Sequence, residues 1–469
     1  MSGHAPTSHR FRANAAEALA NTRQVRVLRT ATARSVAGRM QALAERPDWE
    51  ALRVRARQIK RETLSRLDHY LVELETRVQE QGGTVAWARD AAEARRYIVD
   101  LARARGVTTA VKAKSMTSEE IDLNAAFEAA GVTPVETDLG EYIVQLARET
   151  PSHIILPAIH KSRGDVSALF ERELGTAPTE DVAVLAGIAR RVLRERFLQA
   201  GMGVSGANFA VAETGTLVIV ENEGNIRFST GAPRIHVALV GIEKVIPRLD
   251  DVATFLRLLP RSGTGQRITS YVNFLNGPRR PDEDDGPDEL HLVLLDNGRS
   301  RILADPDARE SLLCIRCGAC LNVCPVYQRV GGHAYGWVYP GPLGAMITPQ
   351  YLGLDRASEL PFASSLCGAC KDACPVRIDI PRVLLHLRQT LREPEATRTR
   401  GLAAWIEKRS VRFAAWTMRS PGRFAAAGRF LRLGLWLSAL GGRAPRVPGW
   451  SKTRDFPAPA RRSLRELLS

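Results

Sequence analysis

The chain has 469 residues, of which 44% are hydrophobic, and a formal net charge of +15. This length is enough for roughly two to four domains with buried cores. No run of about 18 apolar residues occurs, so no transmembrane helix is predicted. The N-terminus also lacks the apolar core of about 7–15 residues that a secretory signal needs. We therefore expect a cytoplasmic protein.

The charge is unevenly placed along the chain. Residues 1–60 carry a net charge of +8 and residues 381–469 one of +14, whereas the part between them carries −7. Basic ends around an acidic centre argue against a nucleic-acid-binding core, so we expect no nucleic-acid partner. The arginine-rich apolar stretch at 423–443 predicts either peripheral contact with the inner membrane face or docking on the protein or a partner.

The first clear periodicity predicts a helix over residues 61–81. Apolar residues recur there at spacings of three and four, and Gly82 and Gly83 end the pattern. From there to about residue 305, helical runs such as 182–200 alternate with short strand-like runs. The strand-like runs are 108–114, 153–159, 216–222, 235–242 and 290–295. This alternation predicts an α/β domain with a mostly parallel sheet.

The segment GMGVSG, residues 201–206, matches a dinucleotide-binding fingerprint by its letters alone. It follows a predicted helix and precedes a predicted strand, whereas the fingerprint requires the reverse order. We therefore expect it to be a helix stop and a loop, and we expect no nicotinamide or flavin site there.

Two polar stretches are candidates for ligand binding. The first combines residues 111–124, 136–143 and 157–163, and the second is 207–230. Both place charged and amide groups at predicted strand ends, where open α/β sheets bind ligands. His160-Lys161 and the segment Asn222 to Arg227 are the densest parts of these stretches. Capping, turn formation and surface ion pairs are the alternative explanation for any single one of these residues.

All seven cysteines lie in two runs. The first run follows C-x2-C-x2-C-x3-C-P, and the second repeats it 50 residues later with Ser364 in place of the first cysteine. An odd number of clustered cysteines without a signal peptide indicates metal chemistry in a reducing compartment. The spacing is typical of iron–sulfur ligation, because a zinc ribbon needs two CxxC pairs and no cysteine-proline ending.

In two-cluster ferredoxins the fourth cysteine of each run binds the cluster of the other run. This rule predicts a first, [4Fe–4S] cluster bound by Cys314, Cys317, Cys320 and Cys374. It predicts a second cluster bound by Cys324, Cys367 and Cys370, with Ser364 at the remaining corner. The second cluster is then [3Fe–4S], or [4Fe–4S] with serine, water, another residue or a partner's ligand at the fourth iron. Alternatively, Ser364 only caps the helix that carries Cys367.

Several of these stretches resemble one family over nearly the whole chain. The stretches are VKAKSMTSEEIDLN (111–124), PSHIILPAIHKSR (151–163), CIRCGACLNVCPVY (314–327), GGHAYGWVYPGPLGA (331–345) and SSLCGACKDACPV (364–376). They are similar to the lactate-utilisation iron–sulfur protein B family. The resemblance implies an α/β LUD domain, which is sugar-isomerase/CoA-transferase-like, and then an all-α helical ferredoxin module. It also implies a role in oxidising L-lactate to pyruvate, with a cysteine-rich redox protein and a second LUD protein as partners.

We therefore expect four regions: a basic helical segment at 1–60, the LUD domain at 61–305, the ferredoxin module at 306–390 and a helical basic tail at 391–469. The expected function is an electron-transfer subunit of a bacterial L-lactate-oxidising complex. The alternative is an enzyme in its own right, acting at a pocket of the LUD domain or at an incompletely ligated cluster iron.

Overall fold

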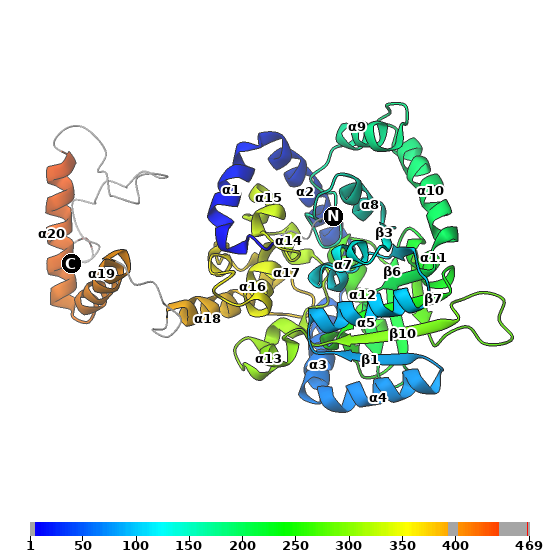
Figure 1. Ribbon diagram of the computed structural model, residues 1–469. Coiled ribbons are helices and arrows are strands. Elements are labelled where there is room, and N and C mark those ends of the chain that lie inside the picture. The colour runs from blue at the N-terminus through cyan, green and yellow to red at the C-terminus, as the bar shows by residue number, and fades with distance from the viewer. Residues whose placement is uncertain (1–4, 393–401, 440–466, 468–469) are drawn as a thin grey trace. The chain divides into compact units, whose positions relative to one another are not determined.

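The computed structural model describes residues 5–392, 402–439 and 467. The chain divides into two compact units, Met1–Leu391 and Arg392–Ser469. The first unit holds the α/β domain and the helical module with the cysteines, and the second unit is helical (Figure 1). The fold class predicted from the sequence is thereby confirmed.

The α/β domain is built on a six-stranded sheet in which every neighbouring pair is parallel. In spatial order its strands are β1 (Thr84–Ala88), β10 (Glu289–Leu295), β7 (Ile235–Gly241), β4 (Met202–Ser205), β2 (Thr109–Lys112) and β3 (Thr133–Glu136). All seven residues of the central strand β7 are buried. Helices cover both faces of a parallel sheet, so its inner strands read as continuous apolar runs.

Several helices of this domain begin at a polar side chain that caps them. Asp90, Asp138, Ser162 and Asp181 each accept a hydrogen bond from a backbone N–H in the first turn of α5, α8, α9 and α10, respectively. Such caps satisfy donors that the helix itself leaves free. The helices are α5 (Ala91–Ala104), α6 (Met116–Glu120), α7 (Leu123–Ala129), α8 (Leu139–Leu146), α9 (Arg163–Leu174), α10 (Val182–Gln199) and α11 (Asn225–Gly231).

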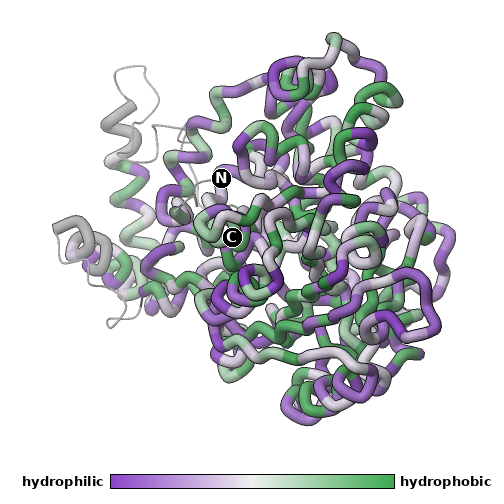
Figure 2. The backbone as a smooth tube through the Cα atoms, turned by 45° about the vertical axis from the view of Figure 1, so that its right-hand side comes forward, coloured by the Kyte–Doolittle hydropathy of each residue, from purple (hydrophilic) through white to green (hydrophobic). Residues whose placement is uncertain are grey.

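A smaller four-stranded sheet has the order β8-β5-β6-β9. Its strands are β5 (Phe209–Val211), β6 (Thr216–Glu221), β8 (Val245–Ile246) and β9 (Tyr271–Leu275). Helices α3 (Trp49–Ser65), α4 (Leu67–Glu80) and α12 (Val252–Gly263) share one hydrophobic core with this sheet and with the cysteine-bearing helices. Figure 2 shows that hydrophobic and hydrophilic residues alternate along many of the coiled segments of the chain.

Two local predictions were wrong. Residues 153–159 form a loop, because Pro157 has no N–H and its carbonyl accepts from Ser152 at 2.9 Å, which closes the loop on itself. The segment 201–206 is mostly strand β4 and not a loop. A Cβ at Gly203 would lie 1.7 Å from the carbonyl oxygen of Ser229 in α11, so glycine permits the close helix–strand approach.

The predicted helix over 61–81 is also divided. Its first residues end α3 and the rest form α4, with a break at Arg66, whose φ of −134° and ψ of 36° are not helical. Gly83 precedes β1, and the helix ends where the glycine pair predicted.

The cysteine-bearing part is made of short helices. They are α13 (Arg299–Ala304), α14 (Ala319–Asn322), α15 (Tyr327–Val330), α16 (Gly341–Leu352), α17 (Ala369–Ala373) and α18 (Ile380–Arg392). The N-terminal helices α1 (Phe11–Ala20) and α2 (Thr22–Ala44) pack against α15, and α2 also packs against α14 (Figure 1). Side chains of α2 and α3 also bond to the end of α17: Arg39 donates to the carbonyl of Ala373 at 3.1 Å, and Arg53 Nε donates to that of Cys374 at 3.0 Å.

The second unit contains α19 (Leu402–Met418) and α20 (Pro421–Ala439), which pack against each other. Among the described helices, none is both long and apolar enough to cross a membrane. Phe413, Phe424 and Phe430 of these helices are exposed. Residues 440–443 of the predicted interfacial stretch lie outside the described part.

A buried network of charged side chains ties the α/β domain to the cysteine-bearing part. Arg299 donates to both oxygens of Glu120 at 2.9 Å and also donates to Glu243. Tyr339 donates to Glu120 at 2.8 Å, and Arg316 donates to Glu243 at 3.3 Å. Burial alone would raise the pKa of Glu243, but Arg299 and Arg316 outweigh it and lower this pKa to about 2.

We predict that Arg299→Met destabilises the protein by about 3–5 kcal/mol, because it leaves two buried carboxylates without their main partner. The measurement is the thermal unfolding temperature. Arg301→Met is the matched control, since Arg301 lies on the same helix but is exposed and donates to the carbonyl of Gln350. Equal unfolding temperatures for the two variants would contradict this role of Arg299.

Candidate functional site

A pocket of about 1000 Å³ opens at the carboxyl ends of the parallel strands. Residues that directly follow β2, β3, β4 and β7 line it, as do the end of β6 and the loop before α9. Ligands of open α/β sheets bind at this edge. The structure therefore brings the two predicted polar stretches together around one cavity, including Lys114, Asp138, Lys161, Asn222 and Glu223.

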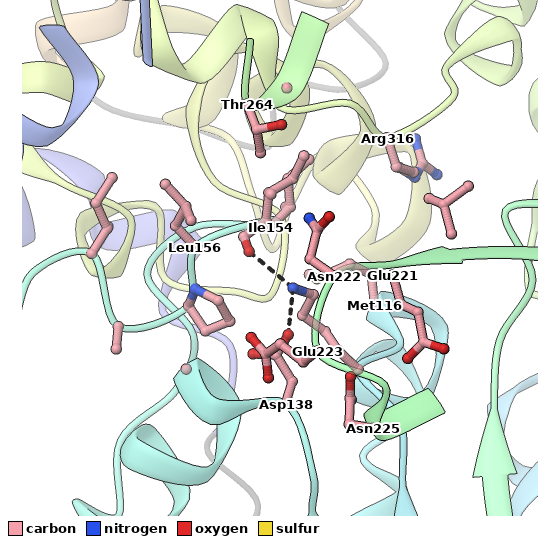
Figure 3. Close-up of a pocket in the computed structure, with 18 of the residues that line it drawn as sticks. Met116, Asp138, Ile154, Leu156, Glu221, Asn222, Glu223, Asn225, Thr264 and Arg316 are labelled. Carbon is pink, nitrogen blue, oxygen red and sulfur yellow. Dashed lines mark hydrogen bonds and ion pairs between the residues drawn. The ribbon is translucent and has the colours of Figure 1, made fainter. Parts of the chain in front are cut away.

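One wall of the pocket carries a lysine between acidic groups. Lys114 Nζ donates to Asp138 at 2.9 Å and to the carbonyl of Ile155 at 2.9 Å (Figure 3). Burial alone would lower the pKa of Lys114, but Asp138 outweighs it and raises this pKa. Glu223 lies beside Asp138, and burial followed by that charge raises the pKa of Glu223. The ammonium group and the carboxyl groups of this wall can therefore hold or release a proton.

The opposite wall is basic. Arg316 extends to this wall from the first cysteine run (Figure 3). Lys244, which follows strand β7, also lines the pocket. Burial lowers the pKa of Lys244 to about 8. Arg23, Arg26 and Arg34 of α2 add exposed positive charge at the rim. A pocket with these groups favours small anionic ligands.

Arg316 joins the pocket to the cysteines. Its backbone N–H donates to Cys314 Sγ at 3.4 Å, and its guanidinium lies 4.9 Å from the ring centre of Tyr339. Arg316 Nη1 is buried and has no hydrogen-bond partner among the described residues. No sequence pattern singled out Arg316, Lys244 or Tyr339. Of these three residues, only Arg316 had a sequence signal, which is its position inside the first cysteine run.

The fold brings the two cysteine runs together, because α14 packs against α17. Burial, and then Cys374 and Cys314, raise the pKa of Cys317. Burial raises the pKa of Cys374 to about 11, and Cys314 contributes to the rise. The thiol of Cys374 thus lies within electrostatic range of the first run, about 50 residues earlier in the chain.

The remaining cysteines form a second neighbourhood. Burial, followed by Cys324, raises the pKa of Cys370 to about 12, and Cys367 contributes as well. Cys367 is the exposed cysteine of the chain. A hydrogen bond from Ser365, followed by the backbone N–H of Ala369, lowers the pKa of the Cys367 thiol.

Ser364 does not cap the helix after it. Helix α17 begins at Ala369 with Gly368 as its N-cap residue. The hydroxyl of Ser364 instead accepts from the backbone N–H of Leu366 at 3.1 Å, and Leu366 has a positive φ of 54°. Ser364 therefore shapes the turn before Cys367, and the capping alternative is wrong.

Comparison with known proteins decides the family. A family model described as LUD domain matches residues 71–295, and one described as 4Fe-4S dicluster domain matches residues 310–378. Lactate utilization protein B of Bacillus licheniformis is 40% identical over 464 residues, which cover 98% of this chain and 96% of that protein. The chain belongs to the lactate utilization protein B family. The resemblance stated from the sequence is thereby confirmed.

Two further similarities differ in sequence identity and in the share of the chain that they cover. Lactate utilization protein B of Bacillus cytotoxicus is 41% identical over 441 residues, which cover 93% of this chain and 92% of that protein. The crystal structure of a DUF162 family protein from Deinococcus radiodurans at 1.70 Å resolution aligns with a TM-score of 0.26 and 14% identity. That alignment covers 49% of this chain and 98% of the other. As a member of the lactate utilization protein B family, the chain combines a LUD domain with an iron–sulfur module.

His153 connects the pocket loop to the first cysteine run. Its Nδ1 accepts from the backbone N–H groups of Ile155 and Leu156 at 3.0 and 3.1 Å. Its Nε2 donates to Asn322 Oδ1 at 3.2 Å. Burial lowers the pKa of His153 to about 3.

This shift predicts a loss of stability in acid. Between about pH 6.5 and pH 3 the unfolded chain binds a proton on His153 that the folded chain excludes, so stability falls as pH falls, by at most about 1.4 kcal/mol per pH unit. We expect the unfolding temperature of His153→Gln to fall less than that of the wild type when the pH is lowered from about 7.5 to about 5.5. His69→Gln is the control, because His69 is exposed. Parallel pH profiles for all three proteins would contradict the assignment.

Proposed function

We propose that the protein is the iron–sulfur electron-transfer subunit of a bacterial complex that oxidises L-lactate to pyruvate. The names of its relatives and the dicluster domain support this role. The observation that carries it is the placement of the two cysteine groups. The first group adjoins the pocket through Arg316, whereas the second reaches the surface at Cys367.

The proposed cofactors are two iron–sulfur clusters. The proposed ligands of the first, [4Fe–4S] cluster are Cys314, Cys317, Cys320 and Cys374, and those of the second are Cys324, Cys367 and Cys370. The second is [4Fe–4S] or [3Fe–4S]. The electrostatic neighbours of Cys317, Cys374, Cys324 and Cys370 support this division, whereas Cys320 has neighbours in both groups.

The spacing of the thiols also argues against zinc. Zn–S bonds of about 2.3 Å in a tetrahedron place the four sulfurs ~3.8 Å apart. Among the residues that the structure describes, no three cysteine sulfurs come as close together as one such ion requires. Cysteine sulfurs that lie further apart fit a cofactor with several metal atoms, such as an iron–sulfur cluster.

Bound clusters would accept and release one electron at a time. They could therefore pass on, one after the other, the two electrons that the oxidation of lactate delivers. The chain supplies positive charge beside the first group to offset the negative charge of a reduced cluster. Arg39 and Arg53 lie near Cys374, and Arg316, Lys244 and Lys60 lie near Cys314. The proposed partners are a cysteine-rich redox protein, a second LUD protein and, peripherally, the membrane surface.

A second candidate function is oxidation of a small hydroxy acid in the pocket of this chain. The basic wall of Lys244 and Arg316, opposite Lys114 and Asp138, favours it. A carboxylate held at that wall would lie beside the first cysteine group.

One experiment separates the two functions. We expect L-lactate to bleach the visible absorption of the anaerobically purified protein only when the partner proteins are present. D-lactate is the control for specific turnover. Bleaching by L-lactate without partners would support the second function, and no bleaching in either mixture would overturn both.

The ligand assignment predicts an effect across the sequence. We expect Cys374→Ala to damage the cluster bound by Cys314, Cys317 and Cys320, because it removes that cluster's fourth thiolate. Cys367→Ala should damage the other cluster. The measurement is electron paramagnetic resonance of each reduced protein. If both variants lose the same signal, the exchange of the fourth ligand is wrong.

A further inference from the structure

A cluster of histidine and glutamate side chains lies away from the cysteines. Glu149 and His160 belong to the loop between α8 and α9, and His333 lies in the short helix His333–Tyr335 between the cysteine runs. One ligand atom from each of the three residues lies within 4.8 Å of the other two. The imidazoles of His160 and His333 meet edge to face, with ring centres 4.7 Å apart.

Hydrogen bonds orient both imidazoles. Nε2 of His333 donates to the backbone carbonyl of Thr150 at 2.7 Å, which leaves the lone pair on its Nδ1. A histidine that ligates a metal usually donates its other N–H to a carbonyl or carboxylate in this way. Nε2 of His160 faces Glu149 at 2.6 Å, so an ion shared by these two residues would take the place of the proton between them.

The contacts present do not satisfy this cluster. The His160 side chain is 7% exposed, and its Nδ1 is buried without a hydrogen-bond partner among the described residues. A buried polar atom left unpaired costs about 1–3 kcal/mol. The Glu149 side chain is 33% exposed, so an ion can reach the cluster from solvent.

We propose that Glu149, His160 and His333 bind one divalent transition-metal ion of the zinc or ferrous class. Two imidazoles and one carboxylate are a common ligand set for both ions. The ion would join the pocket loop to the segment between the cysteine runs, separately from either cysteine group. This inference does not depend on the proposed oxidation of lactate.

Lys161 competes with such an ion. Its Nζ donates to the other carboxylate oxygen of Glu149. A cation bound at Glu149 must share that carboxylate with the ammonium group or displace it. Removing the charge of Lys161 therefore favours metal binding, which a merely structural ion pair would not predict.

The test is equilibrium dialysis of the anaerobically purified holoprotein against Zn²⁺, followed by elemental analysis of zinc and iron. We expect one zinc per chain, with affinity at least roughly tenfold weaker in His160→Gln and His333→Gln. Lys161→Met should bind zinc more tightly than the wild type. His386→Gln is the control, because His386 pairs with Asp305 elsewhere. Unchanged iron content in each variant shows that the protein is intact and that the cysteines have not taken up the zinc.

Thermal unfolding gives a second measurement. Zinc should raise the unfolding temperature of the wild type and of His386→Gln, but not of His333→Gln, because only a folded site binds the ion. If His160→Gln and His333→Gln bind zinc as tightly as the wild type, the site is wrong. If the wild type binds no zinc, or if each variant lowers the unfolding temperature equally with and without zinc, the cluster is only a hydrogen-bonded contact.

Discussion

The buried ion pairs around Arg299 are the constraint on which the arrangement of this protein depends. Arg299 and its carboxylate partners Glu120 and Glu243 are almost fully excluded from solvent. Buried charges are tolerated only when they are paired and hydrogen-bonded, so each of these side chains restricts the others. Because Arg316 and Tyr339 complete the network, it fixes the cysteine-bearing part against the α/β domain.

That position places the first cysteine run, which carries proposed cluster ligands, next to the pocket. The pocket lies where parallel strands end, and Arg316 extends from the first cysteine run into its wall. The same guanidinium donates to Glu243, so a residue that lines the pocket is also held by the network. The wall opposite carries Lys114 and Asp138. A small carboxylate bound between these walls would be within reach of both acid–base groups and the first cysteine group.

The N-terminal helices make the cysteine-bearing part continuous with the rest of the unit. Phe11 of α1 packs against Tyr335, and Arg39 and Arg53 bond to the backbone at the end of the second cysteine run. One hydrophobic core includes residues from α3, the smaller sheet and both cysteine runs. The short helices around the cysteines therefore depend on packing from distant parts of the sequence, because helices this short are not stable alone.

The sequence by itself determined the features that depend on local spacing. The interval between cysteines indicated iron–sulfur ligation, because neighbouring thiolates must reach one cofactor from a single turn of chain. Alternating apolar runs indicated the parallel α/β sheet, because a buried strand must be apolar along its whole length. The helix at 182–200 was recognisable from its own length and composition, and α10 confirms it.

Only the tertiary structure decided the features that depend on distant partners. The apolar segment 153–159 read as a strand, but its residues pack on the cysteine-bearing part and its backbone closes into a loop. Gly203 read as part of a loop, because nothing nearby in sequence shows that Ser229 lies against it. Arg316 and the grouping of His160 with His333 escaped sequence analysis for the same reason. Their roles arise from side chains that meet across 73 and 173 residues, respectively, and local patterns carry no record of such contacts.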